Sequence, residues 1–318
     1  MDLVSPTMRK VVKASARLAP PQGIGASVQE LRAAYCEERR FWNEGGAVMA
    51  SSHDEMIQTR HGAVLLRHHR PTASQDLPVV LYIHGGGWVL GCLDTHDRIM
   101  RSLAAEAGAV VVGIDYSLSP EARFPVAIEQ CVDAIKELVA AGHRPIALAG
   151  DSAGATMALA ATLALREEAG VDAVGLVSGL LLYYGMYGLR DSTSRRLFGG
   201  PWDGMSADDL AYYEGSYLTC PEEVSSPLVD LLSADLTHGI PPCHLVAAQF
   251  DPLRDDSHAL AAILQQRGVR CSLRESPGVL HGFLHYARLL PEARTALASG
   301  AAFLTDLFNS DKPSSHNT

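Results

Sequence analysis

The five residues Gly150–Gly154 (GDSAG) constrain the fold of this chain more than any other segment. They follow a short apolar run that ends at Ala149, and they precede an alanine-rich, helix-like run that begins at Ala155. Strand, sharp turn and helix in this order are typical of a nucleophile elbow, which holds its central residue, here Ser152, in a strained and exposed turn. A side chain at either flanking glycine would collide with neighbouring backbone. We therefore expect Ser152 at the carboxyl end of a strand in an α/β sheet.

Apolar, strand-like runs alternate with helix-like runs from about residue 78 to residue 274. Strands that are apolar on both faces and alternate with helices indicate a mostly parallel sheet with helices on both faces. Ligands of such folds bind at the carboxyl ends of the strands. We expect strands at 79–83, 109–114, 145–149, 173–183, 243–250 and 269–274, helices at 95–107, 126–140, 155–161 and 257–266, and an earlier helix at 28–42.

Three consecutive glycines follow the first of these strands, between His84 and Trp88. Because they lack side chains, their backbone N–H groups can face a substrate oxygen and bind the oxyanion of a tetrahedral intermediate. A phosphate-binding loop is disfavoured, because the G-K-[ST] and G-x-G-x-x-G patterns are absent here. We expect Trp88 and Asp151 to contact the substrate. The candidate oxyanion donors are Gly85, Gly86, Gly87 and Ala153.

The acid that would orient a catalytic base has three candidates after the strand-like run 243–250. Asp251 precedes Pro252, which biases it away from the helical region and keeps it at the end of the strand. Asp255 and Asp256 lie at the start of the next helix, where a carboxylate can cap free N–H groups and oppose the helix dipole. We therefore expect Asp251 to be the functional acid and the other two to be structural.

The candidate base is His281, one of thirteen histidines. It lies in the loop that follows the last expected strand, at the edge where the other candidates gather. A nearby rival, His285, lies one helical turn later and is expected to point along the following helix. The pair His68–His69 is expected at a solvated strand end without a functional role. Ser152, His281 and Asp251 would then be the nucleophile, the base and the orienting acid.

Composition and charge disfavour several classes of protein. With 318 residues, of which 47% are hydrophobic, the chain can form one large core. A formal net charge of −10 without a basic stripe disfavours a nucleic-acid partner. The six cysteines form no C-x-x-C pair and have no metal-ligand spacing, so we expect reduced, mostly buried thiols and no metal site. We see neither a secretory signal nor a membrane-spanning run, which predicts a soluble cytoplasmic protein.

Two segments interrupt the alternation of strands and helices. Residues 1–45 include a helix-like stretch at 28–42, where apolar residues recur near helical spacing. Residues 185–227, rich in aromatic and charged side chains, are an insertion at the active-site edge of the sheet. It forms either a lid over the site or a surface elaboration, and the length of the connection favours a lid. The catalytic core is expected over 46–184 and 228–309, and a disordered tail over 310–318.

Four motifs together resemble those of the hormone-sensitive-lipase-like esterases, a family with the α/β-hydrolase fold: His84–Gly87, Gly150–Gly154, Asp251–Asp255 and His281–Phe283. The likeness extends from about residue 78 to residue 285. Within this family the chain is similar to bacterial acetyl esterases over 113–125, 187–192 and 284–286, although Trp88 stands where those esterases usually have phenylalanine.

The resemblance implies an α/β-hydrolase fold with a helical cap, formed by N-terminal cap helices over 1–45 and the insertion over 185–227. It also implies a carboxylesterase that acts on short acyl esters without a cofactor, with Ser152, Asp251 and His281 as the catalytic triad. Because some members of the family dimerise, a homodimer is an open alternative. The required partner would be a small-molecule ester, with acyl groups from acetyl to about hexanoyl, and not a nucleic acid or a membrane.

Two other functions remain open from the sequence. A non-catalytic or dual-role protein with this fold could act as a ligand sensor and bind a regulatory protein partner. Such proteins usually lack a triad residue, and all three are present here. Lactonase, amidase or deacetylase activity would use the same triad, since the choice of substrate depends on the pocket.

Overall fold

The computed structural model describes residues 3–20, 25–144, 146–169, 175–200 and 202–310. The described strands are β1 (Ser51–Thr59), β2 (Gly62–Arg70), β3 (Val79–Ile83), β4 (Val110–Asp115), β5 (Ile146–Asp151), β6 (Val177–Tyr183), β7 (Cys243–Ala248) and β8 (Cys271–Ser276). The described helices are α1 (Pro6–Leu18), α2 (Val28–Asn43), α3 (Leu93–Ala107), α4 (Val126–Ala140), α5 (Ala153–Ala169), α6 (Thr193–Leu197), α7 (Ala207–Tyr217), α8 (Arg254–Gln266) and α9 (Pro291–Ser310). Short 3-10 turns are η2 (Pro221–Ser225), η3 (Leu231–Ser233) and η4 (Phe283–Tyr286).

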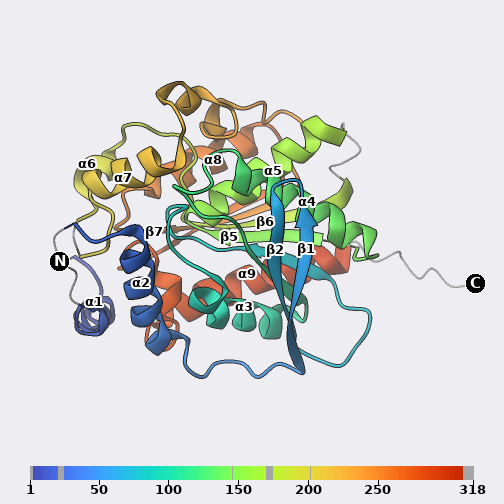
Figure 1. The fold of residues 1–318 in the computed structure, drawn as a ribbon, viewed down its shortest axis with the longest axis horizontal. Coiled ribbons are helices and arrows are strands. Elements are labelled where there is room, and N and C mark those ends of the chain that lie inside the picture. The colour runs from blue at the N-terminus through green and yellow to red at the C-terminus, as the bar shows by residue number, and fades with distance from the viewer. Residues whose placement is uncertain (1–2, 21–24, 145, 170–174, 201, 311–318) are drawn as a thin grey trace, which may run out of the picture.

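The strands form one eight-stranded sheet with the order β1-β2-β4-β3-β5-β6-β7-β8 (Figure 1). The six strands β3, β4, β5, β6, β7 and β8 run parallel to one another, whereas β2 pairs antiparallel with both β1 and β4. The expected mostly parallel α/β sheet is therefore confirmed. The parallel strands are joined by helices, so their carboxyl ends lie at one edge, where the candidate residues gather.

Helices cover both faces of the sheet, and each face has its own apolar core (Figure 1). Successive residues of β3 divide between the two cores: Leu81 packs with the residues of α4 and α5, and Tyr82 packs with those of α3 and α9. Both β3 and β5 are buried along their whole length. A strand buried on both faces needs apolar residues at every position, which explains the continuous apolar runs in the sequence.

The segments expected to form a cap are helical and lie on one side of the sheet. Helices α1 and α2 lie below α6 and α7 at the left of Figure 1. The division into cap and core stays a prediction. The tail expected over 310–318 lies outside the described residues except for Ser310, which ends α9. Residues 173–174 of the expected strand 173–183 also lie outside them. Among the described helices, none is both long and apolar enough to cross a membrane.

The hairpin β1–β2 was missed by the sequence analysis, which gave bounds for no strand before residue 79 and expected only a strand end at His68–His69. Strand β1 is the edge of the sheet and is exposed along most of its length, so its sequence carries no apolar run. The expectation that His68 and His69 lie at a solvated strand end is also wrong. The two residues are only 8% and 1% exposed. His69 lies against α3, with its Nε2 3.2 Å from Asp97 Oδ1, and the His68 ring stacks on that of His53.

The cysteines differ from expectation in their burial. All six are free, but only Cys131 and Cys243 are buried, and Cys220 is exposed. The Sγ atoms of Cys36 and Cys92 lie 3.8 Å apart. This contact joins α2 to the residue that precedes α3, so spacing along the chain gave no sign of it.

Candidate active site

Ser152 lies in a tight turn between β5 and α5. Its φ angle is +52°, a left-handed conformation that residues other than glycine rarely adopt. The N–H of Ser152 donates to the carbonyl of Tyr183 at 2.8 Å, which fixes the turn against β6. A Cβ on Gly150 would lie 2.5 Å from the carbonyl carbon of Gly154, and one on Gly154 would lie 2.0 Å from the carbonyl oxygen of Ile83. The collision expected at both flanking glycines is confirmed.

Ser152, His281 and Asp251 form a continuous chain of hydrogen bonds. His281 Nε2 lies 2.8 Å from Ser152 Oγ, and His281 Nδ1 lies 2.7 Å from Asp251 Oδ2. The other carboxylate oxygen of Asp251 accepts the N–H of Leu253 at 2.8 Å, and Asp251 is fully buried. A carboxylate at Nδ1 keeps the proton on that ring nitrogen, so the Nε2 lone pair faces the serine hydroxyl. The arrangement can deprotonate Ser152 as the serine attacks an acyl carbon.

The pKa of His281 lies above its usual value of 6.5. Burial by itself lowers the pKa of this imidazole, but the negative charge of Asp251 and its hydrogen bond outweigh burial. Asp203 and Asp151 raise the pKa of His281 further. The same negative groups stabilise the imidazolium that forms when His281 accepts a proton, so the site favours a general base at this position.

The backbone N–H groups of Gly86, Gly87 and Ala153 line the pocket and are available to a ligand. None of the hydrogen bonds between described residues uses them, and Ala153, as the first residue of α5, has no intrahelical acceptor for its N–H. The N–H of Gly85, in contrast, donates to Asp151 Oδ1 at 3.0 Å. The expectation that all three glycines are oxyanion donors is therefore wrong for Gly85, which anchors the loop.

Asp151 lies beneath this loop, and protein donors already surround its carboxylate. Its Oδ1 accepts the Tyr82 hydroxyl at 2.7 Å as well as the Gly85 N–H, and His96 Nε2 lies 3.3 Å away. Burial by itself raises the pKa of Asp151, but His96 and the hydrogen-bond donors outweigh it and hold the pKa well below its usual range. The residue is only 2% exposed. Asp151 therefore positions the glycine loop, and because it also lines the pocket, its expected contact with the substrate stays a prediction.

Asp255 and Asp256 bind the inserted segment and not the start of their own helix. Asp256 Oδ1 accepts the N–H groups of residues 187–189 at 2.8, 3.0 and 3.2 Å. Asp255 Oδ2 accepts the N–H of Ser194, at the start of α6, at 2.9 Å. Both are structural as expected, but the N–H groups that they satisfy belong to the chain after β6.

His285 turns inward and does not point along a helix. It lies in η4, where its Nε2 is 3.3 Å from the Tyr35 hydroxyl and its ring contacts His96 edge-on at 4.5 Å. Burial lowers the pKa of His285 well below its usual value. His285 is therefore a neutral part of the pocket wall at physiological pH.

A pocket of about 420 Å³ lies over Ser152, within the size range of small-molecule sites. Trp88 lines it, and its ring stacks on that of Tyr217 with centroids 4.3 Å apart. Helices α1 and α2 form a second wall. The inserted segment contributes Trp202, Met205, Leu210 and Tyr213, which favours the lid over mere surface elaboration.

The sequence analysis missed three charged residues of the pocket: Asp203, Arg39 and Glu38. Asp203 Oδ1 accepts the N–H groups of Gly200 and Met205, whereas its Oδ2 is buried with no hydrogen-bond partner among the described residues. Burial raises the pKa of Asp203. Arg39 donates to Glu38 Oε2 at 2.7 Å. No local motif marks any of the three residues, and the charged, aromatic composition of the insertion was the only signal for Asp203.

Comparison with known proteins agrees with this geometry. A family model described as alpha/beta hydrolase fold matches residues 80–285. A hyperthermophilic esterase from the archaeon Pyrobaculum calidifontis is 32% identical, covering 96% of this chain and 99% of its own, with a TM-score of 0.89. A thermostable carboxylesterase cloned from a metagenomic library is 31% identical over 92% of this chain and 100% of its own, with a TM-score of 0.85. A thermostable esterase from Pseudomonas putida is 25% identical over 96% and 98%, with a TM-score of 0.87. The chain therefore belongs to the α/β-hydrolase family, among its hormone-sensitive-lipase-like esterases.

Proposed function

We propose that this protein is a serine carboxylesterase that hydrolyses short-chain acyl esters, from acetyl to about hexanoyl. The observation that most supports this proposal is the hydrogen-bonded chain from Asp251 through His281 to Ser152 beside a pocket of about 420 Å³. A related ester hydrolase from the metagenome of Lake Arreo, 26% identical to this chain, was solved in complex with a derivative of bipyridine phosphonate.

The reaction begins when Ser152 Oγ attacks the ester carbonyl carbon and His281 Nε2 accepts the serine proton. The carbonyl electron pair moves onto oxygen, and the N–H groups of Gly86, Gly87 and Ala153 stabilise this oxyanion. When the carbon–oxygen bond of the ester breaks, His281 passes its proton to the leaving alkoxide. A neutral alcohol departs, and the acyl group stays on Ser152 as an ester.

Water then hydrolyses the acyl-enzyme by the same route. His281 Nε2 accepts a proton from the water as its oxygen adds to the acyl carbon. The second tetrahedral intermediate collapses, Ser152 Oγ leaves, and His281 returns the proton to it. Asp251 stays ionised throughout and stabilises the imidazolium, while Asp151 holds the glycine loop through Gly85.

The pocket walls support a limit on acyl length. Each methylene that enters an apolar pocket contributes about 0.8 kcal/mol, and α1 offers apolar contacts from Met8 and Val12. The volume of about 420 Å³ must hold both the acyl and the alcohol groups. An acyl chain that meets the wall formed by Trp88, whose ring stacks on Tyr217, loses about 1 to 3 kcal/mol through overpacking. We therefore expect the highest kcat/KM between acetyl and hexanoyl esters and a steep fall beyond octanoyl.

The experiment measures kcat/KM for p-nitrophenyl acetate, butyrate, octanoate and palmitate, with Ser152→Ala as the blank. A steady rise to palmitate would contradict the limit on chain length. Faster hydrolysis of lactones or anilides than of any ester would contradict the substrate class.

The wall itself is tested by Trp88→Ala, which should move the optimum towards longer acyl chains. Trp202→Ala is the matched control, because Trp202 also lines the pocket but is 49% exposed. An equal shift in both variants would mean that Trp88 does not limit the acyl chain.

A further inference from the structure

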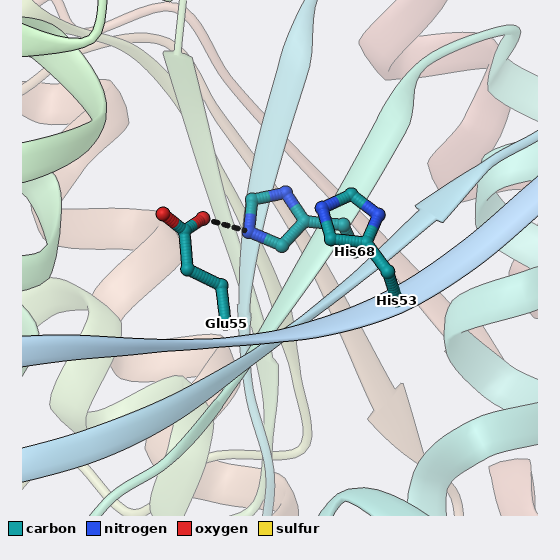
Figure 2. A group of neighbouring side chains, drawn as sticks. All are labelled: His53, Glu55 and His68. Atoms are coloured by element: carbon teal, nitrogen blue, oxygen red, sulfur yellow. Dashed lines mark ion pairs between the residues drawn. The ribbon is translucent and has the colours of Figure 1, made fainter.

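The edge hairpin β1–β2 brings three metal-ligating side chains together, far from the catalytic site. His53 of β1 pairs in register with His68 of β2, and Glu55 lies two residues after His53. Because side chains alternate along a strand, all three leave the same face of the hairpin. Figure 2 shows the His68 ring beside the His53 ring, with the Nε2 atom of His68 facing the Glu55 carboxylate. Strands β2, β4 and β3 separate β1 from β5, which carries the nucleophile turn.

The spacing of the donor atoms suits a shared metal ion. His68 Nε2 lies 3.2 Å from Glu55 Oε2, and ligand atoms of all three residues lie within 4.8 Å of one another. Two ligands of a tetrahedral Zn²⁺ ion, each about 2.0 to 2.1 Å from the metal, lie roughly 3.3 Å apart. The pair formed by Glu55 and His68 already has this separation. The His53 ring, stacked on His68 at 4.7 Å, is exposed and needs only to turn about its side-chain bonds.

His68 offers a nitrogen that the described part of the protein leaves unsatisfied. Its Nε2 is buried and has no hydrogen-bond partner among the described residues, since the contact with Glu55 lacks hydrogen-bond geometry. A neutral imidazole nitrogen is a common metal ligand, so an Nε2 atom without a hydrogen-bond partner among those residues is available to a cation.

We propose that His53, Glu55 and His68 form a surface site for one divalent transition-metal ion of the Zn²⁺ class. Two imidazoles and one carboxylate are a ligand set that Zn²⁺ accepts in open sites, with water in the remaining position. Strand β1 pairs only with β2, so the ion would cross-link the edge strand to the rest of the sheet. An ion that binds the folded hairpin and not the unfolded chain stabilises the fold.

A second group of potential ligands, formed by His96, Asp151 and His285, is less suited to an ion. All three residues are buried, and Asp151 Oδ1 already accepts two hydrogen bonds, from Tyr82 and Gly85. A metal ion there would displace donors that hold the glycine loop. Binding of the ion at this second group is therefore the alternative that the experiment below must exclude.

The experiment titrates chelator-treated full-length protein with Zn²⁺ by calorimetry and with Co²⁺ by visible absorption. We expect saturable binding of one ion per chain and a rise in the unfolding temperature on addition of Zn²⁺. The variants His53→Ala and Glu55→Gln change exposed residues, so the fold should persist. Each should weaken Zn²⁺ binding by at least about 100-fold, since loss of even an outer-shell partner costs 10- to 100-fold.

His61→Ala is the matched control, because His61 forms an exposed ion pair with Glu129 but has no third potential ligand among the described residues. Its Zn²⁺ affinity should equal that of the unchanged protein, and Zn²⁺ should not alter hydrolysis of p-nitrophenyl acetate. The proposal is overturned by absence of saturable binding, by equal losses in His53→Ala and His61→Ala, or by binding that persists in His53→Ala and inhibits hydrolysis. The last result would place the ion at Asp151.

Discussion

Asp151→Asn tests whether this carboxylate positions the glycine loop or contacts the substrate. Asparagine has nearly the same shape as aspartate, and its Oδ1 can still accept the Gly85 N–H and the Tyr82 hydroxyl. The substitution removes the negative charge. We expect the glycine loop to be held less firmly, so that both the free energy of unfolding and kcat decrease.

The size of the effect follows from two hydrogen bonds to one oxygen. A hydrogen bond to an ionised group contributes about 1.5 to 3 kcal/mol, and one between neutral groups contributes about 1 kcal/mol. Replacing two of the first kind by two of the second lowers the free energy of unfolding by about 1 to 4 kcal/mol. Complete loss of one oxyanion donor lowers kcat by about 100- to 1,000-fold, so a loosened loop should lower it by up to about 100-fold.

Urea unfolding and steady-state kinetics with two esters of different acyl length measure these effects. A loop-positioning role predicts a similar fall in kcat for both esters and little change in KM. Tyr82→Phe is the matched control, because it removes one donor to Asp151 Oδ1 and leaves the charge in place. Tyr82→Phe should lower the free energy of unfolding and kcat, but less than Asp151→Asn does. An unchanged free energy of unfolding together with a raised KM would refute this reasoning and identify Asp151 as a substrate contact.

Four further substitutions separate the roles of the remaining site residues. Ser152→Ala should lower kcat about a million-fold with the fold intact, and residual activity above a few per cent would mean that another residue is the nucleophile. Asp251→Asn should lower kcat about 10⁴-fold. Asp256→Ala should mainly lower the free energy of unfolding, by roughly 3 to 5 kcal/mol, because buried N–H groups lose their acceptor. The reverse pattern would make Asp256 the catalytic acid and Asp251 the structural one. Asp203→Asn should move the acidic limb of the profile of kcat/KM against pH to lower pH. Activity needs neutral His281 and falls as the pH drops through its pKa, which Asp203 raises, so an unmoved limb would show that Asp203 does not act on the base.

The central sheet could be predicted from sequence because its elements are buried on both sides. The expected bounds 79–83 and 126–140 coincide with those of β3 and α4. The triad residues were found for a related reason: each follows a strand, and the carboxyl ends of parallel strands meet at one edge. The hairpin β1–β2 escaped prediction because β1 is exposed on both faces over most of its length and carries polar residues there, His53 and Glu55 among them. A strand with so few buried positions has too few apolar residues to be distinguished from a polar loop.

The roles of the acidic residues could not be predicted, because the role of a carboxylate depends on donors that are distant in the sequence. Asp151 adjoins the nucleophile, yet the Gly85 N–H that it accepts lies 66 residues away. Asp256 occupies the first turn of α8, where capping was the natural expectation, but its acceptor oxygen faces N–H groups 67 to 69 residues earlier. Asp203 lies in the insertion, whose length indicates proximity to the site but not which side chain reaches His281. In each case the sequence correctly places the residue near the active-site edge, and only the folded chain shows whether the carboxylate holds a loop, anchors the insertion or raises the pKa of the base.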